Sequence, residues 1–124
     1  LASNNKTPSI GIGADGSTLM RLGEFETISR SNLKWPIVII NDGALGTMKY
    51  RQGFRGYKDY GLDLTMVDFA EIGKSCGLNG ETVDNPEDFK KVLSKSLKSD
   101  KTYIIDARIE PSAYQDNFGG TIGD

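Results

Sequence analysis

An uninterrupted run of four β-branched apolar residues, Ile37 to Ile40, constrains the fold more than any other feature. A strand with one face in water alternates apolar and polar side chains, whereas this run is apolar at every position. Pro36 lies immediately before the run and ends any helix that precedes it. Strands buried on both faces are typical of parallel sheets covered by helices, so we expect an α/β fold.

Helical periodicity is present on both sides of this strand. Within residues 18–33 the apolar positions recur about once per helical turn, at Leu19, Leu22, Phe25, Ile28 and Leu33. Gly23 lies inside this predicted helix and costs it about 1 kcal/mol relative to alanine. Residues 65–68 resemble a capping box that opens a second helix. The inner face of that helix is predicted to contain Phe69, Ile72, Gly73 and Cys76.

A third helix is predicted to follow Asn85. Asn85 suits the N-cap, Pro86 suits the first helical position, and the two acidic residues that come next complement the helix dipole. The predicted buried positions of this helix are Phe89, Val92, Leu93 and Leu97.

Strands alternate with these helices along the chain. Extended segments are expected at 9–13, 81–83 and 102–109, in addition to the apolar run. This order predicts an α/β domain with a doubly wound, mainly parallel sheet and helices on both faces. We assign residues 1–110 to that domain. Residues 111–124 have turn composition without periodicity, and we assign them to a C-terminal tail.

The composition excludes several classes of site and partner. Because the chain contains no histidine, histidine-based triads and imidazole metal ligands are excluded. A net charge of −2 provides no overall attraction for nucleic acid or for an anionic membrane. The apolar run is far shorter than the ~20 residues of a membrane-spanning helix, and no signal peptide is recognisable. The single cysteine, Cys76, suits a reducing compartment. We expect a soluble, cytoplasmic protein.

Two acidic residues follow neighbouring predicted strands, each in a glycine context. Asp15 lies in the sequence Ala-Asp-Gly-Ser, and Asp42 lies in Asn-Asp-Gly-Ala. A right-handed crossover puts both strand ends at one edge of the sheet, so the two carboxylates can converge. Magnesium prefers one or two carboxylates together with phosphate oxygens and water, and glycines let backbone amides approach a phosphate. The pattern predicts a metal and diphosphate site.

The segment from Gly13 to Asp42 resembles the thiamine diphosphate motif, Gly-Asp-Gly followed about two dozen residues later by Asn-Asn. Between its ends, Glu24-Phe25-Glu26-Thr27 with Arg30 and Asn32-Leu33 is similar to acetolactate synthases and their relatives. The similarity continues to about Ile109. The chain thus resembles the C-terminal, diphosphate-binding domain of the acetolactate synthase and pyruvate decarboxylase family, without the first part of that domain.

The resemblance implies a set of binding residues. Asp15, Asp42 and the Ala44 carbonyl would bind magnesium, and amides near Gly16, Ser17 and residues 45–47 would hold the diphosphate. The implied cofactor-binding residues are Gly13, Ala14, Asp15, Gly16, Ser17, Asp42, Ala44, Leu45, Gly46 and Thr47. Two positions depart from the family: Ala14 replaces the leading glycine, and Asp42 replaces an asparagine. The second change adds attraction for the metal and repulsion for the diphosphate.

The resemblance also implies partners and an activity. The substrate would be a 2-oxo acid, with acetolactate synthase as the nearest pattern and another 2-oxo acid decarboxylase or carboligase as the alternative. The glutamate that activates the cofactor belongs to a pyrimidine-binding domain of the same or a neighbouring subunit, so we expect a homo-oligomeric full enzyme. We assign no catalytic residue to this chain, and we expect the isolated chain to be inactive.

Other interpretations of these motifs stay open. The glycines from Gly11 to Gly16 also fit a dinucleotide-binding module without catalysis, or turns with only a structural role. Residues 43–64 read as a long loop after a possible short helix. Their interleaved basic and aromatic residues fit a surface for single-stranded nucleic acid, but we favour a lid over cofactor and substrate.

Overall fold

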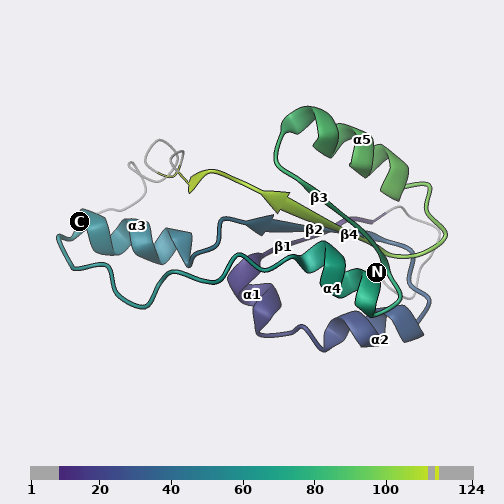
Figure 1. Cartoon of the computed structure of the whole chain (residues 1–124), viewed down its shortest axis with the longest axis horizontal. Coiled ribbons are helices and arrows are strands. Elements are labelled where there is room, and N and C mark those ends of the chain that lie inside the picture. Colours follow the sequence, from purple (N-terminus) through teal and green to yellow (C-terminus); the bar gives the residue numbers. More distant parts are fainter. Residues whose placement is uncertain (1–8, 112–113, 115–124) are drawn as a thin grey trace.

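The computed structural model describes residues 9–111 and residue 114, and its centre is a parallel sheet of four strands. The strand order across the sheet is β1-β2-β4-β3. The strands are β1 (Gly11–Ala14), β2 (Pro36–Asn41), β3 (Asn79–Val83) and β4 (Tyr103–Arg108). All three neighbouring pairs are parallel, so the carboxyl ends of the strands lie at one edge (Figure 1). The run Ile37 to Ile40 forms the middle of β2, as predicted.

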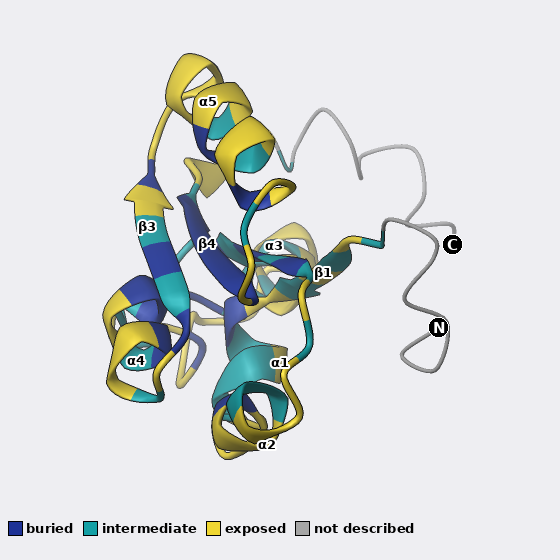
Figure 2. Cartoon of the chain, turned by 90° about the vertical axis from the view of Figure 1, so that its right-hand side faces the viewer, coloured by how far each residue is buried: buried dark blue, intermediate teal, exposed yellow. Residues whose placement is uncertain are grey.

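Five helices connect these strands within the described part of the chain (Figure 1). They are α1 (Asp15–Leu19), α2 (Glu24–Arg30), α3 (Gly46–Phe54), α4 (Phe69–Ser75) and α5 (Pro86–Ser96). Helix α5 covers one face of the sheet, and α1, α2 and α4 cover the other (Figure 2). The prediction of an α/β fold with helices on both faces is confirmed.

Each face of the sheet has its own apolar core. On the α5 side, Val38 and Ile105 of the central strands pack with Val92. On the other side, Ile39 and Ile104 pack with Phe25 and Phe69 from α2 and α4. Adjacent residues of β2 and β4 therefore point into opposite cores, which explains why both strands are apolar throughout.

The predicted single helix from 18 to 33 is wrong. The chain forms two shorter helices, α1 and α2, separated by a turn in which the Glu24 amide donates to the Arg21 carbonyl. Gly23, the residue with the poorest helix propensity in the segment, precedes α2 as its N-cap. The break lets Leu19 and Leu22 pack on the same core as Phe25.

Two details of the other helices also differ from the predictions. Helix α4 is capped by Asp68, whose carboxylate accepts from the Glu71 amide at 2.9 Å, and not by a box that starts at Thr65. A carboxylate is a strong cap because it also complements the helix dipole. Leu97, the C-cap of α5, is 50% exposed, and Ser96 takes the buried position instead. The Asn85 cap is confirmed, since its side chain accepts from the Asp88 amide.

Helix α3 lies apart from the two packed layers. It begins just beyond the carboxyl end of β2 and contains no buried residue within its described length (Figure 1). The loop that follows it returns to the strand ends, where the Leu45 amide donates to the Leu62 carbonyl and the Leu64 amide donates to the Gly43 carbonyl. The predicted short helix and long loop are both present.

Candidate functional site

Asp15 and Asp42 come together at the carboxyl ends of β1 and β2. These strands are direct neighbours, and Ala14, the residue before Asp15, pairs with Ile40, two residues before Asp42. Oδ2 of Asp15 accepts a hydrogen bond of 3.0 Å from the amide of Gly43, the residue after Asp42. Both aspartates line the same cavity of about 210 Å³. The predicted convergence of two acidic strand ends is therefore present.

The Asp15 carboxylate is buried and held by backbone amides. The residue is only 4% exposed. Its Oδ1 accepts from the Gly16 amide at 2.7 Å, while Oδ2 receives the Gly43 amide. Among the described residues, no lysine or arginine forms an ion pair with Asp15 or Asp42. Two neighbouring carboxylates without a basic partner favour the binding of a divalent cation.

The Asp42 carboxylate is held by its own turn and by the C-terminal segment. Oδ1 accepts from the Ala44 amide at 3.0 Å, and the Tyr114 hydroxyl donates to Oδ2 at 2.7 Å. Burial, together with the adjacent Asp42, raises the pKa of Tyr114 to about 12. A phenol keeps its proton at neutral pH in any case, and this shift extends its role as a donor to Asp42 to more alkaline pH.

Nine of the ten predicted cofactor-binding residues line this cavity. They are Ala14, Asp15, Gly16, Ser17, Asp42, Ala44, Leu45, Gly46 and Thr47. Gly13 lies one residue further back in β1 and is not part of the lining. Ile40, Met48 and Tyr114 complete the wall. A larger hollow of about 720 Å³ adjoins the cavity, shares Asp42, Ala44, Gly46 and Tyr114 with it, and extends along α3.

The absence of side chains at three glycines makes this cradle possible. A Cβ on Gly46 would stand 2.1 Å from Oδ2 of Asp42, and a Cβ on Gly16 would stand 2.6 Å from Cδ2 of Leu45. Gly43 has a φ of +68°, which side-chain-bearing residues rarely adopt. These glycines keep the backbone close to the two carboxylates, as a site for phosphate and metal requires.

Some of the predicted phosphate-binding amides already have partners within the protein. The Gly16 amide donates to Asp15, and the Leu45 amide donates to the Leu62 carbonyl. The Ser17 hydroxyl donates to the Ala14 carbonyl at 2.8 Å and so closes the turn into α1. Gly46 and Thr47 begin α3, and the first amides of a helix have no acceptor within the helix.

The donor set fits a hard cation. The described residues contain no group of three or more acidic, cysteine or histidine side chains that could enclose a metal. If two carboxylates and a backbone carbonyl bound a cation, its remaining coordination positions would be left to water or phosphate oxygens. This is the ligand environment in which magnesium is usually found, and it differs from the closed nitrogen and sulfur sites of zinc.

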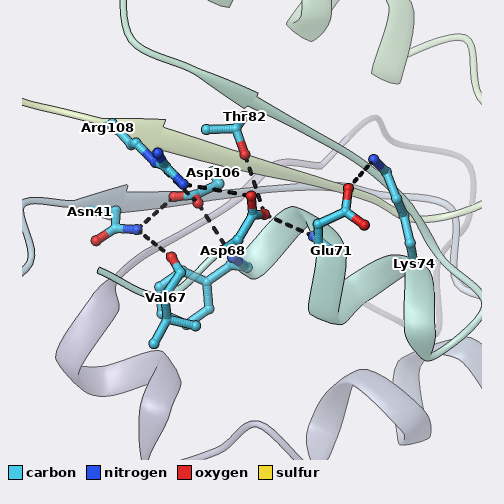
Figure 3. A network of polar contacts seen from close by, with 9 residues as sticks. Asn41, Val67, Asp68, Glu71, Lys74, Thr82, Asp106 and Arg108 are labelled. Carbon is cyan, nitrogen blue, oxygen red and sulfur yellow. Dashed lines mark hydrogen bonds and ion pairs between the residues drawn. The ribbon is translucent and has the colours of Figure 1, made fainter. Parts of the chain in front are cut away.

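Sequence reasoning missed two buried polar residues beneath the site, Asn41 and Asp106. Asn41 ends β2, and Asp106 lies within the apolar strand β4 (Figure 3). Burial raises the pKa of Asp106, although the hydrogen bond from Asn41 opposes this shift. A carboxylate inside an otherwise apolar strand was the one signal that could have identified it. Tyr114 was also missed, because it lies in the tail.

Comparison with known families identifies the class of protein. The family model described as "Thiamine pyrophosphate enzyme, C-terminal TPP binding domain" matches residues 1–107. The chain therefore belongs to this family, whose cofactor is thiamine diphosphate. The resemblance seen in the sequence is confirmed.

Individual relatives are consistent with this assignment. The chain is 30% identical over 107 residues to a putative thiamine pyrophosphate-containing protein, YdaP, of Bacillus subtilis, covering 86% of this chain and 19% of that protein. It is 35% identical over 112 residues to the sulfopyruvate decarboxylase subunit beta of Methanocaldococcus jannaschii, covering 90% and 55%. The chain thus spans only about a fifth to about half of the length of these relatives.

A solved structure shares the fold. The 4-hydroxybenzoylformate decarboxylase of Rhodococcus jostii, a thiamine diphosphate-dependent enzyme, aligns with a TM-score of 0.79 at 22% identity, covering 89% of this chain and 21% of that one.

In the part of the chain that the structure describes, no helix has the length and apolar character needed to cross a membrane.

Proposed function

We propose that this chain binds magnesium and the diphosphate of thiamine diphosphate at the carboxyl ends of β1 and β2. The observation that carries the proposal is the arrangement of the two aspartates. The buried Asp15 is hydrogen-bonded to the turn that carries Asp42, and both line one glycine-lined cavity. A divalent cation would neutralise this pair of carboxylates and attract the anionic diphosphate.

Each residue of the site has a defined role in this proposal. The carboxylates of Asp15 and Asp42 and the carbonyl of Ala44 would be the protein ligands of the metal. The amides of Gly46 and Thr47, at the start of α3, would donate to the diphosphate oxygens. Residues 13–17 form the strand end and turn that hold Asp15 in place. Bound thiamine diphosphate supplies the nucleophilic carbon for decarboxylation of a 2-oxo acid.

The activity of the whole enzyme is proposed from the family and the relatives together. We propose a 2-oxo acid as substrate, with an acetolactate synthase-like reaction of pyruvate as one candidate. Relatives named as acetolactate synthase large subunits are 26 to 27% identical to this chain. The second candidate is a simple 2-oxo acid decarboxylase. It is supported by the identity of 35% to a sulfopyruvate decarboxylase subunit.

We also propose a protein partner, the pyrimidine-binding domain of the same or a neighbouring subunit, within a homo-oligomeric enzyme. Helix α3 and the loop after it carry exposed apolar side chains: Met48, Phe54, Tyr57 and Tyr60. Met48 lines the cavity and Phe54 lines the larger hollow, and α3 extends from the end of β2 away from the sheet (Figure 1). A second domain that covered this surface would enclose the cofactor and bury these side chains.

The metal assignment can be tested with Mn²⁺ as a paramagnetic substitute for magnesium. The dissociation constant of Mn²⁺ in the presence of thiamine diphosphate is measured by electron paramagnetic resonance. We expect Asp15→Asn to weaken Mn²⁺ binding by at least about tenfold, because even residues that only support metal ligands have effects of this size. Asp100→Asn is the control, since it removes the same charge from an exposed position just before β4. Equal affinities for both variants and the parent chain would contradict the proposal.

A further inference from the structure

Asn41, the last residue of β2 before Asp42, and Asp106 of β4 form a buried polar pair (Figure 3). Asn41 is 1% exposed and Asp106 is not exposed at all. Burying a carboxylate in an apolar strand is costly unless hydrogen bonds compensate for the lost water. A hydrophobic residue would fill this position of β4 at lower cost. The ion pair with Arg108 on the same strand is 3.8 Å long, too long for a hydrogen bond, so the contact with Asn41 needs an explanation of its own.

The contacts of Asn41 fix the orientation of its side-chain amide. Nδ2 donates to Oδ1 of Asp106 at 2.9 Å and to the carbonyl of Val67 at 3.0 Å. Both partners are acceptors, so the nitrogen of the amide must face them. The oxygen is thereby directed at the turn after β2, where it accepts from the Gly43 amide at 3.3 Å. Every polar atom of the Asn41 side chain has a partner.

The Gly43 amide connects this pair to the proposed metal site. The same N–H donates to Oδ2 of Asp15 at 3.0 Å. Gly43 therefore shares its proton between the carboxylate of Asp15 and the amide oxygen of Asn41. Asp106 is also tied to the start of α4, because the Phe69 amide donates to its second oxygen at 3.3 Å. A continuous set of hydrogen bonds runs from α4 through Asp106, Asn41 and Gly43 to Asp15.

We propose that Asp106 and Asn41 are positioning residues for the metal site. Asp106 selects one orientation of the Asn41 amide, and Asn41 then holds the turn of residues 42–44 in the conformation that directs Asp42 and Asp15 at a common cavity. This inference depends on the proposed function, because it concerns the same site. A site whose supporting residues are fixed in advance binds its metal without having to reorganise its ligands.

Asp106→Asn is the most informative variant, because it keeps the shape of the side chain. An amide at 106 cannot offer acceptors to both Asn41 and the Phe69 amide. The NH₂ group of the new side chain must then face either Nδ2 of Asn41 or the Phe69 amide, and both of these are donors. The Asn41 side chain loses its preference for one orientation. Asn41→Ala removes the link to Gly43 altogether. If the two residues act as one unit, their effects on the metal site are not additive in the double variant.

Thr102→Val is a matched control at the residue just before β4. The Thr102 side chain is buried, and its hydroxyl donates to the Leu33 carbonyl at 2.7 Å. The same hydroxyl oxygen accepts from the Trp35 amide at 3.4 Å, so the substitution removes two hydrogen bonds at the end of the sheet opposite to the site. We expect Thr102→Val to lower the free energy of unfolding while the dissociation constant of Mn²⁺ stays that of the parent chain. It separates loss of stability from loss of positioning.

Two measurements on the full chain test the inference. The first is hydrogen exchange of the Gly43 amide by NMR without metal, in which we expect Asp106→Asn to accelerate exchange at Gly43 but Thr102→Val not to. The second is Mn²⁺ affinity in the presence of thiamine diphosphate, which we expect Asp106→Asn to weaken by roughly 10- to 100-fold. Urea unfolding shows how much of each variant is folded.

The possible outcomes are distinct. Parent-like exchange at Gly43 and parent-like Mn²⁺ affinity in folded Asp106→Asn would overturn the positioning role and leave the proposed function intact. If Asp106→Asn does not fold, Asn41→Ala is judged by the same two criteria. Failure of the parent chain to bind Mn²⁺ with thiamine diphosphate at millimolar concentrations would overturn both proposals.

Discussion

Gly46 shows how closely single residues are fitted at this site. A Cβ at this position would stand 2.1 Å from Asp42 Oδ2 and 2.4 Å from Cε2 of Tyr114. We expect Gly46→Ala to displace one of these side chains at a cost of about 1–3 kcal/mol, in spite of alanine's better helix propensity. If Asp42 is the side chain that moves, we expect weaker binding of Mn²⁺ in the presence of thiamine diphosphate. Each 1.4 kcal/mol of lost binding free energy raises the dissociation constant about tenfold.

The matched control for Gly46→Ala lies on the same helix. A Cβ on Gly53 would meet no described heavy atom within 4 Å, so Gly53→Ala adds helix propensity without a clash. We expect Gly53→Ala to keep the parent's affinity and to raise the free energy of unfolding slightly. Isothermal titration calorimetry and urea unfolding measure the two quantities. Similar behaviour of the two alanine variants would show that close packing at Gly46 has no role.

At the residue scale, the sequence predicts the site where its signals are local. Asp15 and Asp42 each follow a strand within a glycine turn, and strand direction alone brings them to one edge of the sheet. The contacts that hold them are not local. Asn41 and Asp106 are 65 positions apart, and Tyr114 is 72 positions from Asp42. No pattern of spacing identifies such partners, because they meet only once the sheet has formed.

Helix α5 illustrates what holds an element to the sheet beyond its apolar face. Nζ of Lys95 on α5 donates to Glu81 on β3 at 2.5 Å, and the Tyr103 hydroxyl of β4 donates to the same carboxylate. These bonds, with that from Lys95 the larger influence, hold the pKa of Glu81 below its usual value of 4.5. One carboxylate thereby links a helix and two strands.

The lowered pKa of Glu81 predicts a pH-dependent stability. A carboxyl group with a lower pKa in the folded state stabilises the fold above its unfolded pKa and loses that contribution as the pH falls through the folded pKa. We expect Glu81→Gln to lower the free energy of unfolding at neutral pH by less than about 1 kcal/mol, because the side chain is partly exposed. The difference from the parent should vanish as the pH is lowered from about 4.5 through the lowered pKa of Glu81.

Urea unfolding between neutral and acidic pH measures this effect. Glu87→Gln is the control, because Glu87 pairs with Lys90 at 3.7 Å on the exposed side of α5 and forms no ion pair with another element among residues 9–111. We expect Glu87→Gln to show a smaller difference from the parent at every pH. A Glu81→Gln difference that stays constant down to strongly acidic pH would mean that the ion pair does not contribute to stability.

Elements differed in how well local signals predicted them. The start of α5 was predicted correctly because its asparagine cap and first-turn proline act within one turn of the helix. The segment from 18 to 33 has the periodicity of one helix but forms two, because packing of Leu19, Leu22 and Phe25 against the sheet outweighs continuity. Periodicity reports which side chains are buried, and it does not report whether the backbone between them stays helical.

At the scale of the whole molecule, the apolar surface is unevenly covered. Helix α5 packs on β3 and β4, whereas Ile12 of β1, on the same face as Val38, is 75% exposed. Met48 and Phe54 of α3 are exposed as well. Exposed apolar groups that gather on one surface are typical of sites that meet other protein. This arrangement agrees with the proposal that a second domain completes the active site.

The proposal of a second domain has a direct catalytic consequence. In the proposal, the described residues around the cavity would contribute metal ligands, backbone amides and glycines, whereas the glutamate that activates the cofactor would come from the second domain. We therefore expect the purified chain, with thiamine diphosphate and Mg²⁺, to bind cofactor weakly and to release no carbon dioxide from pyruvate or sulfopyruvate.

The Asp15→Asn variant gives the background rate for contaminating activity. Steady turnover by the parent chain above that background would show that the cavity works without a partner. A rate that appears only when a pyrimidine-binding domain is added would support division of the active site between two domains, because binding the diphosphate and activating the cofactor are separate tasks.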